Sequence, residues 1–362
     1  MGNTIHSGSG PRSSVQDHPA GARSSPRVSV IIPTYSDAYL LRKSLPVLLR
    51  NPPDEIEVVI VNNDPSQDVA ESIGELAEDR RVAIVNMGFE AGFARAINRG
   101  IRQSTGELVM FCNADVFPST TYLAEMDEFF ADHPRAGAAI GKLLRYDLAS
   151  DRPTDILDVA ALHLTRQRRM MPLHEGQRDD GRFDQPLEVF ALDGAAMVAR
   201  RAALAAISID GEYLDENFVM HKDDLDVSWR LHLAGWQCWY NPIAVAHHGR
   251  TTRGLGSTRY LSAVLRFHQN ERKKSQHLRI HAMKNQWLML IKHEDLYNFR
   301  RDFPFILARE GTVLIHNLLF APRALVAVPM TVKVLRDTLR KRRAANSTRD
   351  MEPHALRRWL VH

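Results

Sequence analysis

The chain has 362 residues, of which 44% are hydrophobic and 25% charged, with a formal net charge of +4. This is enough apolar material for a buried core, and it excludes a chain that stays disordered throughout. The small basic excess lies toward the C-terminus and no recognition motif accompanies it, so nucleic acid is not an expected partner. Only Cys112 and Cys238 are present, both in apparent strands, which argues against a disulfide scaffold and favours a reducing, cytoplasmic compartment.

Residues 1–26 are rich in Ser, Gly, Pro and Arg and contain no apolar run. Such a composition predicts a disordered tail and does not fit a secretory signal. Between residues 27 and 250, apolar β-branched runs alternate with helical patterns, which predicts an α/β fold with a doubly wound, mostly parallel sheet. The runs that predict strands are 28–32, 57–61, 82–85 and 108–112.

Polar residues follow each of these four predicted strands. In sheets of this kind ligands bind outside the carboxyl ends of the strands, so these residues are expected to form a binding site. Each one alone is typical of an ordinary turn. The first strand is followed by neither a Gly-x-Gly-x-x-Gly motif nor a P-loop, which excludes those two nucleotide sites. The residues are Pro33, Thr34, Tyr35, Ser36, Asn62, Asn63, Asp64, Asn86, Asn113 and Asp115.

Asp115 is the first candidate for metal binding, because it follows a strand and precedes a helix expected to begin near Ser119. An exposed carboxylate there suits a hard cation such as Mg²⁺ or Mn²⁺, which usually shares its oxygen ligands with substrate phosphates. The alternative is a strand-end turn in which Asp115 is only solvated.

A second acidic group, Asp223, Asp224 and Asp226, stands at the start of a predicted amphipathic helix. Part of this clustering of acidic residues has a structural explanation. Acidic residues stabilise a first helical turn by about 0.3–1 kcal/mol each, and Asp226 can pair with Arg230. Mutual repulsion also raises the pKa of one carboxylate, as expected of a general base beside a metal.

Two adjacent histidines, His247 and His248, end a short apolar strand. Neighbouring residues of a strand point to opposite faces, so only one of them can face the site. That imidazole could complete a metal shell with Asp115, whereas the alternative is a histidine of the surface or the core.

Seven segments of the sequence, taken in chain order, resemble inverting glycosyltransferases of family 2 with the GT-A fold. Within that family, the resemblance is to the rhamnosyltransferase-like branch that builds bacterial cell-surface polysaccharides. The matching segments are 28–35, 59–63, 92–100, 112–116, 192–197, 223–230 and 247–249.

The resemblance implies that Asp224 is the catalytic base with Asp223 beside it, and that Asp115 and His247 hold Mg²⁺ or Mn²⁺. Because Asn62, Glu90 and Asn113 depart from the residues usual in the family, the nucleobase stays open. The implied nucleotide-sugar site consists of Pro33, Thr34, Tyr35, Asn62, Asn63, Arg95, Asn98 and Asn113.

The C-terminal third, residues 251–345, is expected to be helical. Its apolar stretch 313–332 is interrupted by polar residues and prolines, so it is not expected to span a membrane. The stretch 333–343 follows with six basic residues and one acidic residue, which favours peripheral contact with an anionic membrane surface. The alternative is a helical subdomain packed on the catalytic core, and residues 346–362 are expected to be a basic tail.

The resemblance therefore implies a metal-dependent inverting glycosyltransferase of the hexosyltransferase type. Its donor would be a nucleotide-diphosphate sugar, with rhamnose as one candidate, and its acceptor a glycan or polyprenyl-linked glycan at the cytoplasmic face of the plasma membrane. Two alternatives stay open. Asn62 and Asn113 favour a non-catalytic nucleotide-sugar-binding homologue, and a sugar nucleotidyltransferase would need a Gly-rich, basic first loop that is absent.

Overall fold

A computed structural model describes residues 26–52, 55–159, 161–249 and 263–361. Residues 1–25 of the predicted tail lie outside the described residues, and so does the segment 250–262, where the predicted catalytic domain ends. One large sheet has the strand order β10-β12-β6-β11-β4-β1-β2-β3, with β5 and β7 attached to β12 and β6. Its strands are β1 (Val28–Thr34), β2 (Ile56–Asn62), β3 (Val82–Asn86), β4 (Leu108–Phe111), β5 (Val116–Pro118), β6 (Ala136–Asp147), β7 (Arg152–Val159), β10 (Leu187–Val189), β11 (Met197–Arg200) and β12 (Gln237–His248).

Four neighbouring strands, β4, β1, β2 and β3, run parallel and confirm the strands predicted from the apolar runs. Strand β1 is buried along almost its whole length, as expected of a strand covered on both faces. Because parallel strands end at the same edge of a sheet, the polar residues after β1, β2 and β4 come together there. The helices of this part of the chain are α1 (Leu41–Leu48), α2 (Val69–Ile73), α3 (Phe93–Arg102), α4 (Tyr122–Asp132), α5 (Arg201–Ala206) and α6 (Asp223–Leu233), with short 3-10 helices η1 (Ala38–Leu40), η2 (Gly74–Glu78) and η3 (Glu216–Phe218).

The other half of the sheet is mixed. Strand β11 lies antiparallel between β4 and β6, whereas β12 runs parallel to β6. Helix α4 begins at Tyr122 and not near Ser119, because Val116–Pro118 first forms β5 and pairs with β12.

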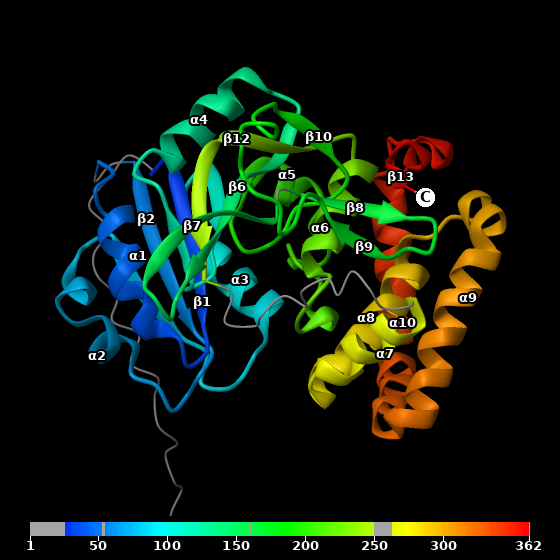
Figure 1. The fold of residues 1–362 in the computed structure, drawn as a ribbon. Helices are drawn as coiled ribbons and strands as arrows, with labels where there is room; N and C mark the ends of the chain where they lie inside the picture. Colours follow the sequence, from blue (N-terminus) through cyan, green and yellow to red (C-terminus); the bar gives the residue numbers. More distant parts are fainter. Residues whose placement is uncertain (1–25, 53–54, 160, 250–262, 362) are drawn as a thin grey trace, which may run out of the picture.

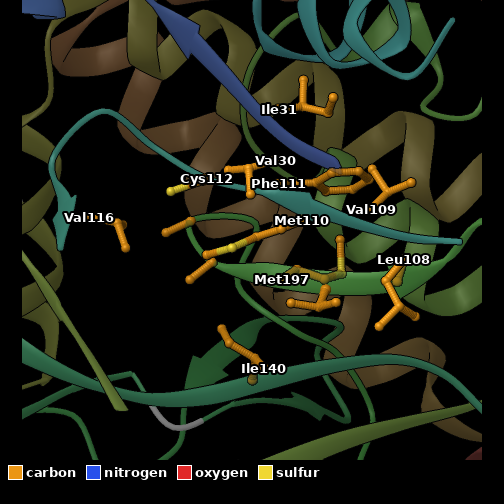
Figure 2. Packing of buried hydrophobic residues seen from close by; sticks show 14 of the residues in the cluster. Val30, Ile31, Leu108, Val109, Met110, Phe111, Cys112, Val116, Ile140 and Met197 are labelled. Atoms are coloured by element: carbon orange, nitrogen blue, oxygen red, sulfur yellow. The ribbon is translucent and has the colours of Figure 1, made fainter. Parts of the chain in front are cut away.

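The core of the large sheet is centred on β4. Figure 2 shows Met110 and Phe111 of this strand among side chains from β1 and Met197 of β11. Fully burying an apolar side chain of this size stabilises the fold by about 1.5–3 kcal/mol, so this packing fixes the strand ends that carry the polar residues. Cys112, in the same cluster, is a buried free thiol, and so is Cys238, in agreement with the prediction that neither belongs to a disulfide scaffold.

The C-terminal third forms helices that stand beside the large sheet (Figure 1). A second apolar core joins them to α6 through Trp229 and Leu233 of α6, Leu288 and Met289 of α8, and Ala345 of α10. In the described part of the chain, none of the helices combines the length and the apolar character needed to cross a membrane. The elements are β8 (Leu162–Thr165), β9 (Met170–Pro172), α7 (Ala263–Lys273), α8 (Gln276–His293), α9 (Leu296–Phe320), η4 (Pro322–Val326), α10 (Ala327–Ser347), η5 (Pro353–Trp359) and β13 (Leu360–Val361), the last of which pairs with β8 in a small sheet with β9.

Candidate active site

A cavity of about 470 Å³ lies at the carboxyl edge of the parallel strands. Asp115 and Asp224, far apart in the chain, both line it. Asp37, Asp193 and His221 line it as well and were not predicted to do so, although Asp193 lies within one of the segments that carry the family resemblance. The predicted site residues that line the cavity are Pro33, Thr34, Tyr35, Asn63, Asn113, Asp115, Asp223 and Asp224.

In one part of the cavity, the side chain of Asp115 lies next to that of His248. The carbonyl of Asp115 accepts a hydrogen bond of 2.8 Å from the N–H of Gly249, which ties its loop to the end of β12. The His248 Nε2 atom lies 3.3 Å from Asp115 Oδ1, and its Nδ1 lies 2.8 Å from Oδ2 of the buried Asp158 on β7. Burial lowers the pKa of His248, but the bonds to both carboxylates outweigh it and raise the pKa to about 9.

The structure corrects the predicted choice between the two histidines. His247 points away from Asp115, with its ring 6.5 Å from that of Tyr146. Pairing of His248 with Val116 and of His247 with Phe117 fixes which face of β12 meets the cavity. The alternation of a strand was predicted correctly, but its register against β5 decides which histidine faces the site.

Asp115 and His248 fit a divalent cation that is shared with a substrate. The carboxylate oxygen and the imidazole Nε2 lie 3.3 Å apart, and a cation bound between them would displace the proton from Nε2, while Asp158 orients the imidazole from behind. Among the described residues, no group of three or more His, Cys, Asp or Glu side chains gathers as a metal site. A cation here would therefore take its remaining ligands from substrate phosphates and water.

The first turn of α6 carries the other acidic group. The carboxylate of Asp224 accepts a hydrogen bond of 2.7 Å from the N–H of Leu225 and one of 3.4 Å from the N–H of Gly194. Burial raises the pKa of Asp224 to about 6, with a further contribution from the negative charge of Asp193. Burial and the charge of Asp224 raise the pKa of Asp223 to about 8. The pair thus holds a proton on one carboxyl while leaving the other available as a base.

Asp226 points the opposite way, into the protein. Its Oδ2 accepts from Arg230 at 2.8 Å, as the i,i+4 spacing predicts, and its Oδ1 lies 2.7 Å from both Lys292 Nζ and His293 Nε2. Burial acts to raise the pKa of Asp226, but Arg230, Lys292 and His293 hold it well below its usual range. The acidic group therefore divides into a pair that faces the cavity and a third member that anchors α6 to α8.

Another wall of the cavity is made by the loops before α3 and before α6. The N–H of Phe93 donates to the carbonyl of Val219 at 2.8 Å. A Cβ added to Gly92, whose φ is +81°, would lie 2.6 Å from that oxygen, so glycine is needed here. In the second loop Val219, His221 and Lys222 have φ of 53°, 60° and 67°. Such conformations cost non-glycine residues about 1–3 kcal/mol each, so this loop needs support from outside.

Helix α8 supplies that support. The side-chain amide of Asn285 lies within 2.8 Å, 2.5 Å and 2.9 Å of the carbonyls of Phe218, Met220 and His221. The residue before it, Lys284, donates to the carbonyl of Asn217 at 2.5 Å. Nothing in the local sequence of α8 indicates this role, because the partners lie more than sixty residues earlier in the chain.

Besides His247, three predicted residues lie outside the cavity. The Asn62 amide donates to the carbonyl of Gln67 at 2.9 Å and closes the turn after β2. Asn98 donates to the carbonyl of Leu214 at 2.8 Å and accepts from its N–H at 2.8 Å. Arg95 pairs with Glu216 at 3.0 Å. We therefore correct their expected placement: they shape and hold loops beside the site and do not line it.

Three buried polar atoms on the cavity wall lack a hydrogen-bond partner within the described structure. They are Thr34 Oγ1, Asn63 Oδ1 and Asp223 Oδ2. Buried polar atoms are nearly always hydrogen-bonded, and leaving one unpaired costs about 1–3 kcal/mol. All three belong to residues that line the cavity.

Part of the chain is similar to known glycosyltransferases. Residues 29–207 match the family model described as Glycosyl transferase family 2. The poly-beta-1,6-N-acetyl-D-glucosamine synthase of Staphylococcus aureus (strain COL) is 24% identical over 219 residues, which are 60% of this chain and 48% of that protein. The protein of the same name from Staphylococcus epidermidis is 25% identical over 219 residues, with the same coverage. The chain spans about half the length of these curated relatives.

A solved structure of GalNAc-T7 with UDP, GalNAc and Mn²⁺ is similar in fold. Its TM-score is 0.53 with 11% sequence identity, over 80% of this chain and 55% of that one. The likeness is one of fold alone, and it confirms the predicted GT-A type of α/β architecture. The part of the chain that runs from β1 to α5, residues 29–207, is therefore similar to a glycosyltransferase domain of family 2.

Proposed function

We propose that this protein transfers a sugar from a nucleoside-diphosphate donor to an acceptor hydroxyl, with inversion at the anomeric carbon, in the synthesis of a cell-surface polysaccharide. One observation carries the proposal: Asp224, with its raised pKa, lines the same cavity as the Asp115–His248 pair. The family match supports sugar transfer. The names of the staphylococcal relatives support a polysaccharide as the product class.

Asp115 and His248 are the residues proposed to hold Mg²⁺ or Mn²⁺. A cation bound there would supply positive charge to the diphosphate as it departs. The GalNAc-T7 structure, which shares the fold, contains UDP and Mn²⁺. Asp158 contributes by keeping the His248 ring turned toward the cavity.

Asp224 is the proposed general base. Its carboxylate receives the proton of the acceptor hydroxyl while the hydroxyl oxygen forms a bond to the anomeric carbon. The bond from that carbon to the donor phosphate oxygen breaks, and its electrons leave with the nucleoside diphosphate. The N–H groups of Leu225 and Gly194 hold the carboxylate in place. A base with a pKa near 6 is largely ionised at neutral pH and still accepts a proton readily.

The donor is proposed to lie along the ends of β1 and β2. Thr34 and Asn63 present unpaired oxygens there, and Tyr35 is an exposed aromatic ring beside them, which together suit the hydroxyl and ring groups of a nucleoside. Rhamnose remains our candidate sugar and a glycan or polyprenyl-linked glycan our candidate acceptor, both on the strength of the family resemblance.

The test is a panel of nucleotide sugars, including a rhamnose donor, with release of nucleoside diphosphate measured in Mn²⁺ or EDTA. Asp224→Asn should keep donor binding in calorimetry and lose about 10²–10⁴-fold in turnover. Asp132→Asn, an exposed change on α4, is the matched control and should behave as the parent. Donor binding without turnover by the parent would favour the non-catalytic alternative, and full turnover by Asp224→Asn would remove Asp224 as the base.

A further inference from the structure

The outer face of α9 exposes large apolar side chains. Among them, exposure reaches 55% for Leu307, 59% for Ile315 and Leu318, and 66% for Leu319. Monomeric soluble proteins rarely leave a continuous surface of this kind uncovered. We name this surface, made of Leu307, Leu314, Ile315, Leu318 and Leu319, the α9 face.

Three polar residues in the second half of the same helix point inward. His316 and Asn317 are buried, and Glu310 accepts from Trp287 of α8 at 2.9 Å. Helix α9 is therefore amphipathic in the structure, with its polar side on α8 and its apolar side outward.

The charges around the α9 face have one sign. Between residues 296 and 343 every exposed charged side chain is basic, whereas the acidic residues Asp302, Glu310 and Asp337 are buried or half-buried and form ion pairs. The exposed basic residues outside ion pairs are Arg300, Arg301, Arg323, Lys333, Arg336 and Arg343.

The basic stretch 333–343 was expected to face a membrane as a whole, but in the structure some of its basic side chains are buried and others are exposed. Lys341 is buried and lies 2.7 Å from Asp215 and 2.6 Å from Glu212, and Arg342 donates to the carbonyls of Ile291 and Glu294 at 2.6 Å. These two residues fasten α10 to the rest of the protein. The available positive charge is therefore shared: Arg300, Arg301 and Arg323 lie on α9 and η4, and Lys333, Arg336 and Arg343 lie on α10.

We propose that the α9 face docks the protein on the surface of an anionic lipid bilayer, such as the cytoplasmic face of the plasma membrane. An amphipathic helix with an apolar side and basic flanks suits the lipid headgroup boundary. Each basic residue near such a surface adds about 1 kcal/mol of attraction. A second copy of the chain fits less well, because a two-fold interface would bring Arg323, Lys333 and Arg336 close to their own copies. This docking goes beyond the proposed chemistry and can be tested without it.

The experiment is co-sedimentation of the full chain with vesicles of phosphatidylcholine alone or with added phosphatidylglycerol. Removing the C-terminal helices is unsuitable, since that would uncover the core shared with α6. The parent should bind the anionic vesicles, and Leu318→Glu with Leu319→Glu should weaken binding at least about tenfold. Ile243→Glu, at an equally exposed apolar residue of β12, is the matched control and should bind as the parent does.

A second variant tests the charge. Changing Arg323, Lys333 and Arg336 to Gln should lower binding to anionic vesicles and make it less sensitive to salt. The proposal is overturned if the parent does not bind anionic vesicles, or if the Leu318 and Leu319 variant binds them equally well. It is also overturned if, without lipid, the parent forms a dimer that this variant converts to a monomer, since the face would then be an interface between copies.

Discussion

Replacing Asn285 with leucine tests whether the C-terminal helices shape the active site. Leucine has a similar size but no amide, so the carbonyls of Met220 and His221 would lose their hydrogen-bond donor. The Phe218 carbonyl would still accept a hydrogen bond from the N–H of Met220. An unpaired buried carbonyl costs about 1–3 kcal/mol, and water can reach the exposed end of this loop. We therefore expect a loss of about 1–3 kcal/mol in the free energy of unfolding.

The effect on activity should be larger than this stability loss implies. The loop that Asn285 holds contains three positive-φ residues and leads directly into the turn that carries Asp224. Once released, it can relax, and a displacement of about 1 Å at a reacting group costs about 10²-fold in rate. We expect kcat to fall by about that factor, with a rise in KM because Val219 and Met220 line the cavity.

The matched control is Asn298→Leu. Asn298 is an equally buried amide that donates to Asp295 and to the carbonyl of Pro353, both at 2.6 Å, away from the cavity. It should lose comparable stability in thermal unfolding and keep the parent kcat and KM. If Asn285→Leu is destabilised but fully active, or if both variants lose the same activity, Asn285 does not position the loop.

Two further predictions concern the charged groups. Asp158→Asn should leave His248 poorly oriented and raise the half-activating Mn²⁺ concentration about 10–100-fold in a turnover titration, and an unchanged value would contradict the assigned cation site. Because the base must be ionised and the pKa of Asp224 is raised to about 6, kcat/KM should fall about tenfold for each pH unit below that value and level off above it. A profile that stays flat from pH 5 to 7 would refute the assignment of Asp224.

The sequence was most informative where function depends on strand ends. Apolar β-branched runs predicted β1 to β4, and the polar residues after these strands included the cavity residues Thr34, Asn63 and Asp115. The prediction succeeded because the carboxyl edge of a parallel sheet brings such residues together whatever the rest of the fold is. The acidic pair at the start of α6 was predicted in the same way, from its place at a helix terminus.

The remaining errors arose where a side chain's direction is set by distant contacts. Asn98 resembles a site residue in sequence, yet its amide is used by the backbone of Leu214. The same limitation applies to His247 and His248, whose orientation depends on strand pairing. Lys341 belonged to an apparent surface run, and only the fold reveals that it meets Asp215.

Support of the Val219–Lys222 turn by α8 also affects how this protein could be divided or recombined. The matched family segment ends at residue 207, before Asp224 and well before Asn285. A chimera built at that boundary would receive its base, and the helix that aligns it, from the other parent. Recombination between relatives should therefore preserve activity only when α6 and α8 are inherited together.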